Sequence, residues 1–287
     1  MSTTAGNRIL GLSPRARRLV IPAFVIAIAV ISIGTYVNRK NDGAKATGPV
    51  VGGDLHAVAQ LDDRLFVGGH AGAGYRVASG GWTQIQSLAD KDVMSWAQSG
   101  STLLAGGHEG LYASADDGSM FTPVPGLSIS DVHGLGAAGD TVYLASPQAG
   151  ILVSTDGGDT FATRSQTGQD FMGSIWVDPT NPEVAIAPSM QQGAVKTTDG
   201  GRNWTALGSS MGAMAVAVNP TGTQLVALAM DGAQQSADGG RTWARLSVPD
   251  GTSAASYTST GDLIVAARSG DRASVYRQTA TGWDPLV

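Results

Sequence analysis

Ser236-Ala237-Asp238-Gly239-Gly240-Arg241-Thr242-Trp243 is one of four copies of the same eight-residue motif in this chain. The other copies are Thr197-Thr198-Asp199-Gly200-Gly201-Arg202-Asn203-Trp204, Ser154-Thr155-Asp156-Gly157-Gly158-Asp159-Thr160-Phe161 and Ser114-Ala115-Asp116-Asp117-Gly118-Ser119-Met120-Phe121. Two shorter versions end at Trp82 and Trp283, so the six closing aromatic residues recur every 39 to 43 residues. A fixed period of this length indicates one supersecondary unit repeated around or along an axis.

Each repeat also contains short apolar runs. One run lies just before each copy, such as residues 141–145, and another lies further upstream, such as residues 214–218. Short runs bounded by Gly, Asn, Asp and Pro are typical of strands rather than helices. We therefore predict four strands per repeat, named A to D in chain order, and an all-β, six-bladed β-propeller over residues 51–287. An open stack of repeats would need polar end repeats, and neither end resembles one.

The motif is predicted to be the tight turn between strands C and D. Its Asp can accept backbone N–H bonds across the turn, and its Gly residues tolerate a positive φ. The Ser or Thr adds a second hydrogen-bonding arm, and we expect the closing aromatic ring to be buried beside the next blade. We assign this structural role, rather than ligand or Ca²⁺ binding, to Asp116, Asp156, Asp199, Asp238, Phe121, Phe161, Trp204 and Trp243.

The N-terminal segment has the pattern of a membrane anchor. Residues 1–18 carry four arginines and no acid, residues 19–37 carry no charge, and Arg39 and Lys40 follow. An uncharged stretch of this length can span a bilayer, and we favour an uncleaved signal anchor over a cleaved signal peptide. The arginines then place residues 1–18 in the cytoplasm and the propeller outside the cell membrane. Residues 38–50 are read as a flexible linker.

Charge divides at this linker. Residues 1–45 hold seven Lys and Arg against one acid, whereas residues 46–287 hold 11 against 22. An acidic domain is a poor partner for nucleic acid. With no Cys in the chain, the propeller must be stabilised by packing alone, without disulfides.

All four histidines are expected on one face of the propeller. Strand A lines the axis of such a fold; the D–A and B–C loops form one face, here the His/Asp face, and the A–B and C–D turns form the other, the motif face. His56 and His133 start strand A in two blades, and His70 and His108 occupy two B–C turns. Histidines confined to blades 1–3 predict an asymmetric ligand site. Asp54 and Asp131 stand two residues before His56 and His133, and could orient them.

Methionines occupy the equivalent positions in other blades, namely Met94, Met172, Met190, Met214 and Met230. A copper site of His, Met and Asp is compatible with these residue types. Alternation of large and small residues along strand A favours packing for the methionines instead. We expect no metal site and no cofactor.

Acid/base candidates are few, since the chain has only two glutamates, Glu109 and Glu183. Glu109 lies in a B–C turn beside His108, whereas Glu183 is assigned to an A–B turn on the motif face. Glycoside hydrolysis usually needs two facing carboxylates. Glu109 and Asp131 are the catalytic candidates. The other carboxylates that could pair with Glu109 are Asp54, Asp92, Asp170 and Asp231.

The repeated motif resembles the Asp-box, or BNR repeat, of sialidases, sortilin-type receptors, xyloglucan hydrolases and photosystem II assembly factors. With the anchor and the strand at residues 133–135, the chain is similar to a bacterial membrane-anchored Asp-box propeller family commonly labelled glycosyl hydrolase. The resemblance covers residues 54–287. It implies the fold strongly and an activity weakly, because its members include enzymes, receptors and assembly factors.

A sialidase is not expected. That family adds an arginine triad, a Tyr nucleophile with a Glu partner and an Arg-Ile-Pro element, and this chain has no Arg-Ile-Pro. Arg202 and Arg241 lie inside motif copies, and Arg268 and Arg272 fall in one blade. A three-armed carboxylate clamp cannot be assembled from them.

We therefore predict a membrane-tethered, extracytoplasmic propeller that binds a glycan or a protein at its His/Asp face. A glycoside hydrolase is the first alternative, and an assembly factor for a membrane complex is the second.

Overall fold

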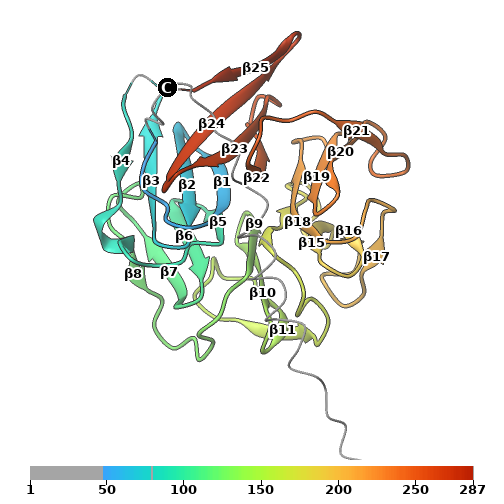
Figure 1. The fold of residues 1–287 in the computed structure, drawn as a ribbon. Helices are drawn as coiled ribbons and strands as arrows, with labels where there is room; N and C mark the ends of the chain where they lie inside the picture. Colours follow the sequence, from blue (N-terminus) through green and yellow to red (C-terminus); the bar gives the residue numbers. More distant parts are fainter. Residues whose placement is uncertain (1–47, 79, 287) are drawn as a thin grey trace, which may run out of the picture. The chain divides into compact units, whose positions relative to one another are not determined.

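The structure of the chain is a computed structural model, which describes residues 48–78 and 80–286. Six β-sheets surround a common axis, which confirms the predicted all-β, six-bladed propeller (Figure 1). Apart from β13, the strands of each blade are consecutive in the chain and paired antiparallel. The only helix in these residues is the 3₁₀ turn η1 (Gln86–Leu88).

The bounds of the strands follow the sequence period. Blade 1 contains β1 (Leu55–Leu61), β2 (Arg64–Gly69), β3 (Gly72–Val77) and β4 (Thr83–Gln84). Blade 2 contains β5 (Ser95–Ser99), β6 (Thr102–Gly107), β7 (Gly110–Ser114) and β8 (Thr122–Pro123). Blade 3 contains β9 (Gly134–Ala138), β10 (Thr141–Ser146), β11 (Gly150–Ser154) and β12 (Ala162–Ser165). Blade 4 contains β13 (Gly173–Ser174), β14 (Trp176–Val177), β15 (Ala185–Ser189), β16 (Gly193–Thr197) and β17 (Thr205–Ala206). Blade 5 contains β18 (Ala213–Val218), β19 (Leu225–Ala229), β20 (Gly232–Ser236) and β21 (Ala244–Leu246). Blade 6 contains β22 (Thr252–Tyr257), β23 (Leu263–Ser269), β24 (Arg272–Thr279) and β25 (Gly282–Pro285).

Strand A of blade 4 is divided between two sheets. Its first part, β13, pairs in parallel with β9, and its second part, β14, pairs with β15 of its own blade. The N–H of Gly173 donates to the carbonyl of His133 at 2.8 Å, and that of Ile175 donates to the carbonyl of Leu135 at 2.7 Å. Blades 3 and 4 are therefore joined at the axis by backbone hydrogen bonds as well as by side-chain packing.

The hydrophobic core is distributed as six clusters, one at each interface between neighbouring blades in the described part of the chain. The cluster between blades 1 and 2 is centred on Phe66, Trp96 and Phe121, whose rings contact one another. The cluster between blades 6 and 1 includes Val58 and Ile264. Because the last blade packs on the first in the same way as its neighbours pack, the ring is closed, and residues 48–286 contain no end repeat.

The closing aromatic residue of each blade packs against the preceding blade, so the prediction that it is buried beside the next blade is wrong. Trp243 of blade 5 joins the cluster of blade 4, and its Nε1 donates to the carbonyl of Leu207 at 2.8 Å. Trp82 of blade 1 packs against blade 6 in the same way. The sequence period gives the spacing of the rings but not the direction in which they point.

The four motif copies form C–D turns with the predicted bonding. In the last copy, Asp238 Oδ1 accepts from the N–H of Arg241 at 3.0 Å and of Thr242 at 2.9 Å. Ser236 Oγ donates to Asp238 Oδ1 at 2.8 Å and accepts from the N–H of Gly240 at 2.9 Å. Gly240 adopts φ = 88°, a region that residues with a Cβ atom avoid. These bonds satisfy the backbone of the turn locally.

Residues 48–52 complete the junction between blades 6 and 1. Val50 pairs antiparallel with Arg272 at the start of β24, and the N–H of Val51 donates to the carbonyl of Asp271 at 2.8 Å. Val51 is fully buried in the cluster between these blades. Residues 48–50, assigned to the linker from the sequence, thus contact the propeller.

Within the described residues there is no helix with the length and apolar character needed to cross a membrane. The predicted anchor at residues 19–37 lies outside this part of the chain.

Candidate functional site: a histidine and aspartate cluster

The four histidines gather on the His/Asp face because each lies at the same end of its strands. His56 lies near the start of β1 and His133 directly precedes β9. His70 and His108 occupy the B–C turns after β2 and β6, each following two glycines. These side chains come from blades 1, 2 and 3, as predicted.

Close backbone packing brings the B–C turn of blade 2 against the D–A loop that carries Asp92. A Cβ atom at Gly107 would lie 1.6 Å from the carbonyl oxygen of Asp92, so only glycine allows this approach. The next residue, His108, is consequently held beside the Asp92 carboxylate. The glycine pair before each turn histidine therefore helps to build the cluster.

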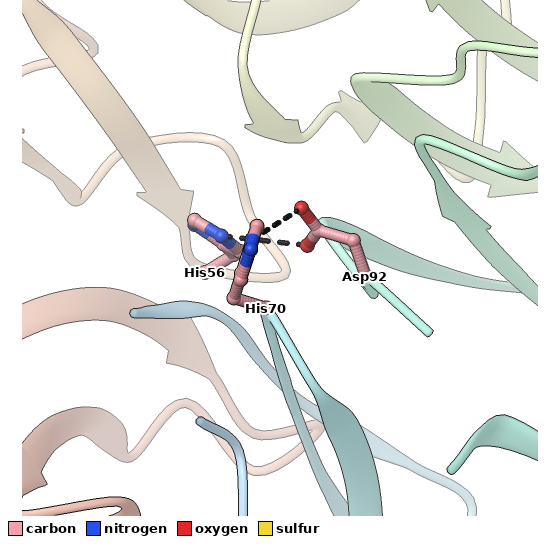
Figure 2. A group of neighbouring side chains, drawn as sticks. All are labelled: His56, His70 and Asp92. Atoms are coloured by element: carbon pink, nitrogen blue, oxygen red, sulfur yellow. Dashed lines mark hydrogen bonds and ion pairs between the residues drawn. The ribbon is translucent and has the colours of Figure 1, made fainter. Parts of the chain in front are cut away.

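Asp92 is the centre of the cluster. Its Oδ1 lies 3.4 Å from Nε2 of His56, and its Oδ2 lies 3.1 Å from Nδ1 of His70 and 2.9 Å from Nδ1 of His108. Figure 2 shows His56 and His70 on one side of the Asp92 carboxylate. Only 4% of Asp92 is exposed, whereas the side chains of His70 and His108 are 61% and 48% exposed. A buried anion thus lies beneath two accessible imidazoles.

A second group adjoins the first through His108. Nε2 of His133 lies 2.9 Å from Oδ1 of Asp131, and Nε2 of His108 lies 3.9 Å from the same oxygen. The rings of His108 and His133 have their centroids 5.2 Å apart. The six side chains therefore form one continuous polar cluster across three blades.

Several buried polar atoms in this cluster make no hydrogen bond. They are Oδ1 of Asp92, Oδ1 of Asp131 and Nε2 of His133. The nitrogen of His133 and the oxygen of Asp131 are close enough to bond, but their orientation does not meet hydrogen-bond geometry. Buried polar atoms are rarely left unpaired, so the cluster has unused hydrogen-bonding capacity.

The environment moves the pKa values of the histidines in opposite directions. Burial lowers the pKa of His56, against the opposing charge of Asp92, and burial likewise lowers the pKa of His133 against Asp131. The hydrogen bond to Asp92 raises the pKa of His108, although burial opposes it. For Asp92 itself, burial favours protonation, but the bond from His108 and the nearby histidine charges outweigh it and lower the pKa. Of His56, His108 and His133, only His108 is stabilised as a cation.

The remaining sequence candidates divide between this cluster and other places. Glu109 is exposed and its carboxylate accepts the backbone N–H of Asp92 at 3.1 Å, so it borders the cluster. Asp54 contributes its backbone carbonyl, which accepts from the N–H of His70 at 3.0 Å. Asp170 and Asp231 instead bond the hydroxyls of Ser189 and Ser210.

The proposed orientation of histidines by preceding aspartates holds for one pair. Asp131 contacts His133, but the carboxylate contacting His56 belongs to Asp92 of the next blade. The cause is a β-bulge, since Leu55 pairs with Gly69 and Ala57 with Gly68, which leaves His56 as the extra residue. A bulge re-aims the side chain that it carries.

From the sequence, Asp92 is only a candidate partner of Glu109, and its central position is not predicted. The available signal is its place in the repeat. Asp54, Asp92, Asp131 and Asp170 each stand just before strand A of blades 1 to 4.

The methionines are divided between the interior and the surface. Met94 is buried, in accordance with the packing interpretation, whereas Met211 and Met230 are 70% and 69% exposed. Met230 follows β19 in the B–C turn of blade 5, and its side chain lies against Gly212. Two apolar side chains are therefore exposed on the His/Asp face.

Neither a protein-family model nor a curated protein matches the chain. Solved structures match its fold. The GH74 xyloglucanase from Xanthomonas campestris has a TM-score of 0.56 and 14% identity, covering 85% of this chain and 46% of the enzyme. The nidogen/laminin complex contains a chain with a TM-score of 0.58 and 13% identity, covering 74% and 87% of the two chains. YCF48 bound to D1 peptide has a TM-score of 0.50 and 17% identity, covering 71% and 69%.

The six sheets define the class of protein as a six-bladed β-propeller, and the matched structures share its fold. At such low identity they concern the fold and leave the activity open. The chain spans less than half the length of the GH74 enzymes that it matches.

Proposed function

We propose that this chain is a binding propeller, tethered outside the cytoplasmic membrane through residues 19–37, that captures a protein or glycan ligand at its His/Asp face. The observation that carries the proposal is the convergence of four histidines and two aspartates from three blades onto one face. Ligands of propellers and barrels are commonly bound at the mouth of the fold, where side chains from several elements meet.

A protein partner is favoured by the exposed groups of this face. His70 and His108 offer accessible donors and acceptors, and Met211 and Met230 offer adaptable apolar contacts across the same face. Among the fold neighbours, YCF48 is bound to a peptide and nidogen occurs in a complex with laminin. An assembly or adaptor role is compatible with the same surface.

A glycoside hydrolase remains the alternative, with Glu109 as its acid/base. Glu109 borders the cluster and accepts the backbone N–H of Asp92. Asp131, the other catalytic candidate, lies against His133. This alternative predicts turnover of a polysaccharide such as xyloglucan and loss of that turnover in Glu109→Gln.

Site-specific photocrosslinking in cells tests the binding function. A photoreactive amino acid replaces Met230 on the His/Asp face or, as a matched control, Met120, which is 60% exposed on the motif face. We expect a discrete crosslinked product in the membrane fraction from position 230 only, and expect His70→Ala with His108→Ala to reduce it. Glycan-array binding that is lost in the same double variant would identify a glycan ligand instead.

Three results contradict the proposal. Equal crosslinking from both positions would mean that the His/Asp face is not the binding surface. If no crosslink forms and polysaccharide turnover depends on Glu109, the function is hydrolysis and not binding. Recovery of the protein in the soluble fraction of cells would reject the tether.

A further inference from the structure

Three side chains of the cluster converge in the manner of metal ligands. His56, His70 and Asp92 each offer one ligand atom, and these atoms lie within 4.8 Å of one another. Figure 2 shows both imidazole rings facing the same carboxylate. From this geometry we propose that His56, His70 and Asp92 bind a divalent transition-metal ion of the zinc and copper class.

The distances between the ligand atoms suit such an ion. Nε2 of His56 lies 3.4 Å from Oδ1 of Asp92, and Nδ1 of His70 lies 3.1 Å from Oδ2 of the same carboxylate. Two ligands with metal bonds of about 2.0–2.1 Å in a tetrahedron are about 3.3 Å apart. Imidazole nitrogen with carboxylate oxygen is a donor set that suits Zn²⁺, Cu²⁺ and Ni²⁺.

The burial of Asp92 is a second, independent indication. Its carboxylate is nearly inaccessible, yet Oδ1 has no hydrogen-bond partner. A buried carboxylate oxygen without a hydrogen bond is costly, and a cation bound between it and the imidazole of His56 would satisfy it. The Asp92 N–H is held by Glu109, which fixes the loop that presents this carboxylate.

Three protein ligands leave at least one coordination position open, as in zinc sites where water or substrate is the fourth ligand. His70 belongs to this set and is largely exposed, so the open position can face solvent. A carboxylate or imidazole of the captured partner could complete the coordination. In this respect the inference rests on the proposed binding function, although the metal site itself can be tested without any partner.

The second group could hold another ion beside the first. His108, Asp131 and His133 also place ligand atoms within 4.8 Å of one another. His108 contacts Asp92 as well, so the two groups share one polar network. We assign the first ion to the His56 group because Asp92 is the most buried carboxylate of the cluster.

Isothermal titration of the full-length protein with Zn²⁺ alone tests the site. We expect saturable binding, weakened by more than about 100-fold in Asp92→Asn and in His70→Ala, because losing a ligand costs at least as much as losing a supporting residue. Asp170→Asn is the matched control, since Asp170 stands at the same position of blade 4 and bonds Ser189 instead of histidine.

Electron paramagnetic resonance of the Cu²⁺-loaded protein gives a readout that loss of folding cannot imitate. We expect the Cu²⁺ spectrum to show coupling to the imidazole nitrogens of its ligands. His70→Ala should be well tolerated because His70 is largely exposed, and its spectrum should show one coupled nitrogen fewer. Binding of Zn²⁺ unchanged in His70→Ala, or equal loss in Asp170→Asn, would overturn the proposal. If position 230 still gives its crosslink but the protein binds no Zn²⁺, the metal site alone is rejected. If the protein binds Zn²⁺ but position 230 gives no crosslink, the binding function alone is rejected.

Discussion

Asp92 shows how a single buried carboxylate can organise several histidines. Its two oxygens face His56, His70 and His108, which come from two blades and three separate segments. Because the carboxylate is buried, its charge is poorly screened by water and acts strongly on the adjacent rings. The protonation of His108 should therefore depend on Asp92.

The first prediction concerns the pKa of His108. In metal-free protein kept in a chelator, Asp92→Asn should lower the pKa of His108, because the bond from this imidazole to Asp92 is the main cause of its raised value. A raised folded-state pKa gives stability that is present below the ordinary value of 6.5 and is lost as the pH rises through the folded value. The variant should show less of this pH dependence.

Proton NMR titration of the histidine rings measures this pKa directly. Asp170→Asn should leave the His108 titration unchanged, since Asp170 bonds Ser189 and the N–H of Gln191. An unchanged His108 titration in Asp92→Asn would show that another group holds its proton.

At the scale of single elements, the turns between strands C and D determine the response to acid. Their aspartates lie at the surface, exposed in two turns and half-buried in the other two, and hydrogen bonds hold their carboxylates in place. The pKa is lowered to about 2 for Asp156 by the hydroxyls of Ser154 and Thr160 and for Asp238 by the hydroxyl and N–H of Thr242. In Asp199, the side chain and N–H of Asn203 have the same effect.

The second prediction follows from these depressed values. A carboxylate with a folded-state pKa of about 2 and an ordinary value of 3.8 adds stability above pH 3.8, and that stability is lost as the pH falls toward 2. Urea unfolding midpoints between pH 5 and pH 2 should fall steeply for the native protein. They should fall less steeply when Asp156, Asp199 and Asp238 are all replaced by Asn.

Asp159→Asn provides the matched control for this series. Asp159 lies in the same turn as Asp156 but is not the residue whose carboxylate accepts the turn bonds. Its replacement should keep the native pH dependence. A triple variant that follows the native curve would show that carboxylates elsewhere cause the acid sensitivity.

Agreement between sequence and structure is closest in these elements. Motif bonding depends on residues within eight positions, so Ser236, Asp238 and Gly240 are enough to predict it. The bulge at His56 depends on pairing with β2, and the contact with Asp92 depends on the neighbouring blade. Neither can be derived from a local pattern, which is why Asp54 was the expected partner.

At the scale of the whole molecule, stability resides between blades. Six clusters join six blades in a ring, and each contains or contacts one closing aromatic residue of the described chain. A closed ring has no free interface at which unfolding can start, unlike a linear array in which repeats can unfold from the ends. We therefore expect the ring to unfold cooperatively.

The third prediction is that Phe121→Ala destabilises the entire ring by about 3–5 kcal/mol, because it leaves a cavity between blades 1 and 2. In protein labelled with fluorotryptophan, the resolved ¹⁹F NMR signals of Trp96, near the cavity, and of Trp283 in blade 6 should report the same shifted transition. The exposed neighbour Met120→Ala should change stability by less than about 0.5 kcal/mol. A shift seen by Trp96 but not by Trp283 would show that blades unfold independently.

The chain enters and leaves the propeller at the same end as its histidines. Residues 48–52 lie against the start of β24, and β25 runs back toward the D–A loops before Leu286. An affinity handle or carrier domain fused after β25 would therefore crowd the ligand-binding end. Because the chain has no cysteine, Met120→Cys gives a single attachment point on the opposite end. Immobilising the protein there leaves the histidine cluster accessible to a partner in solution.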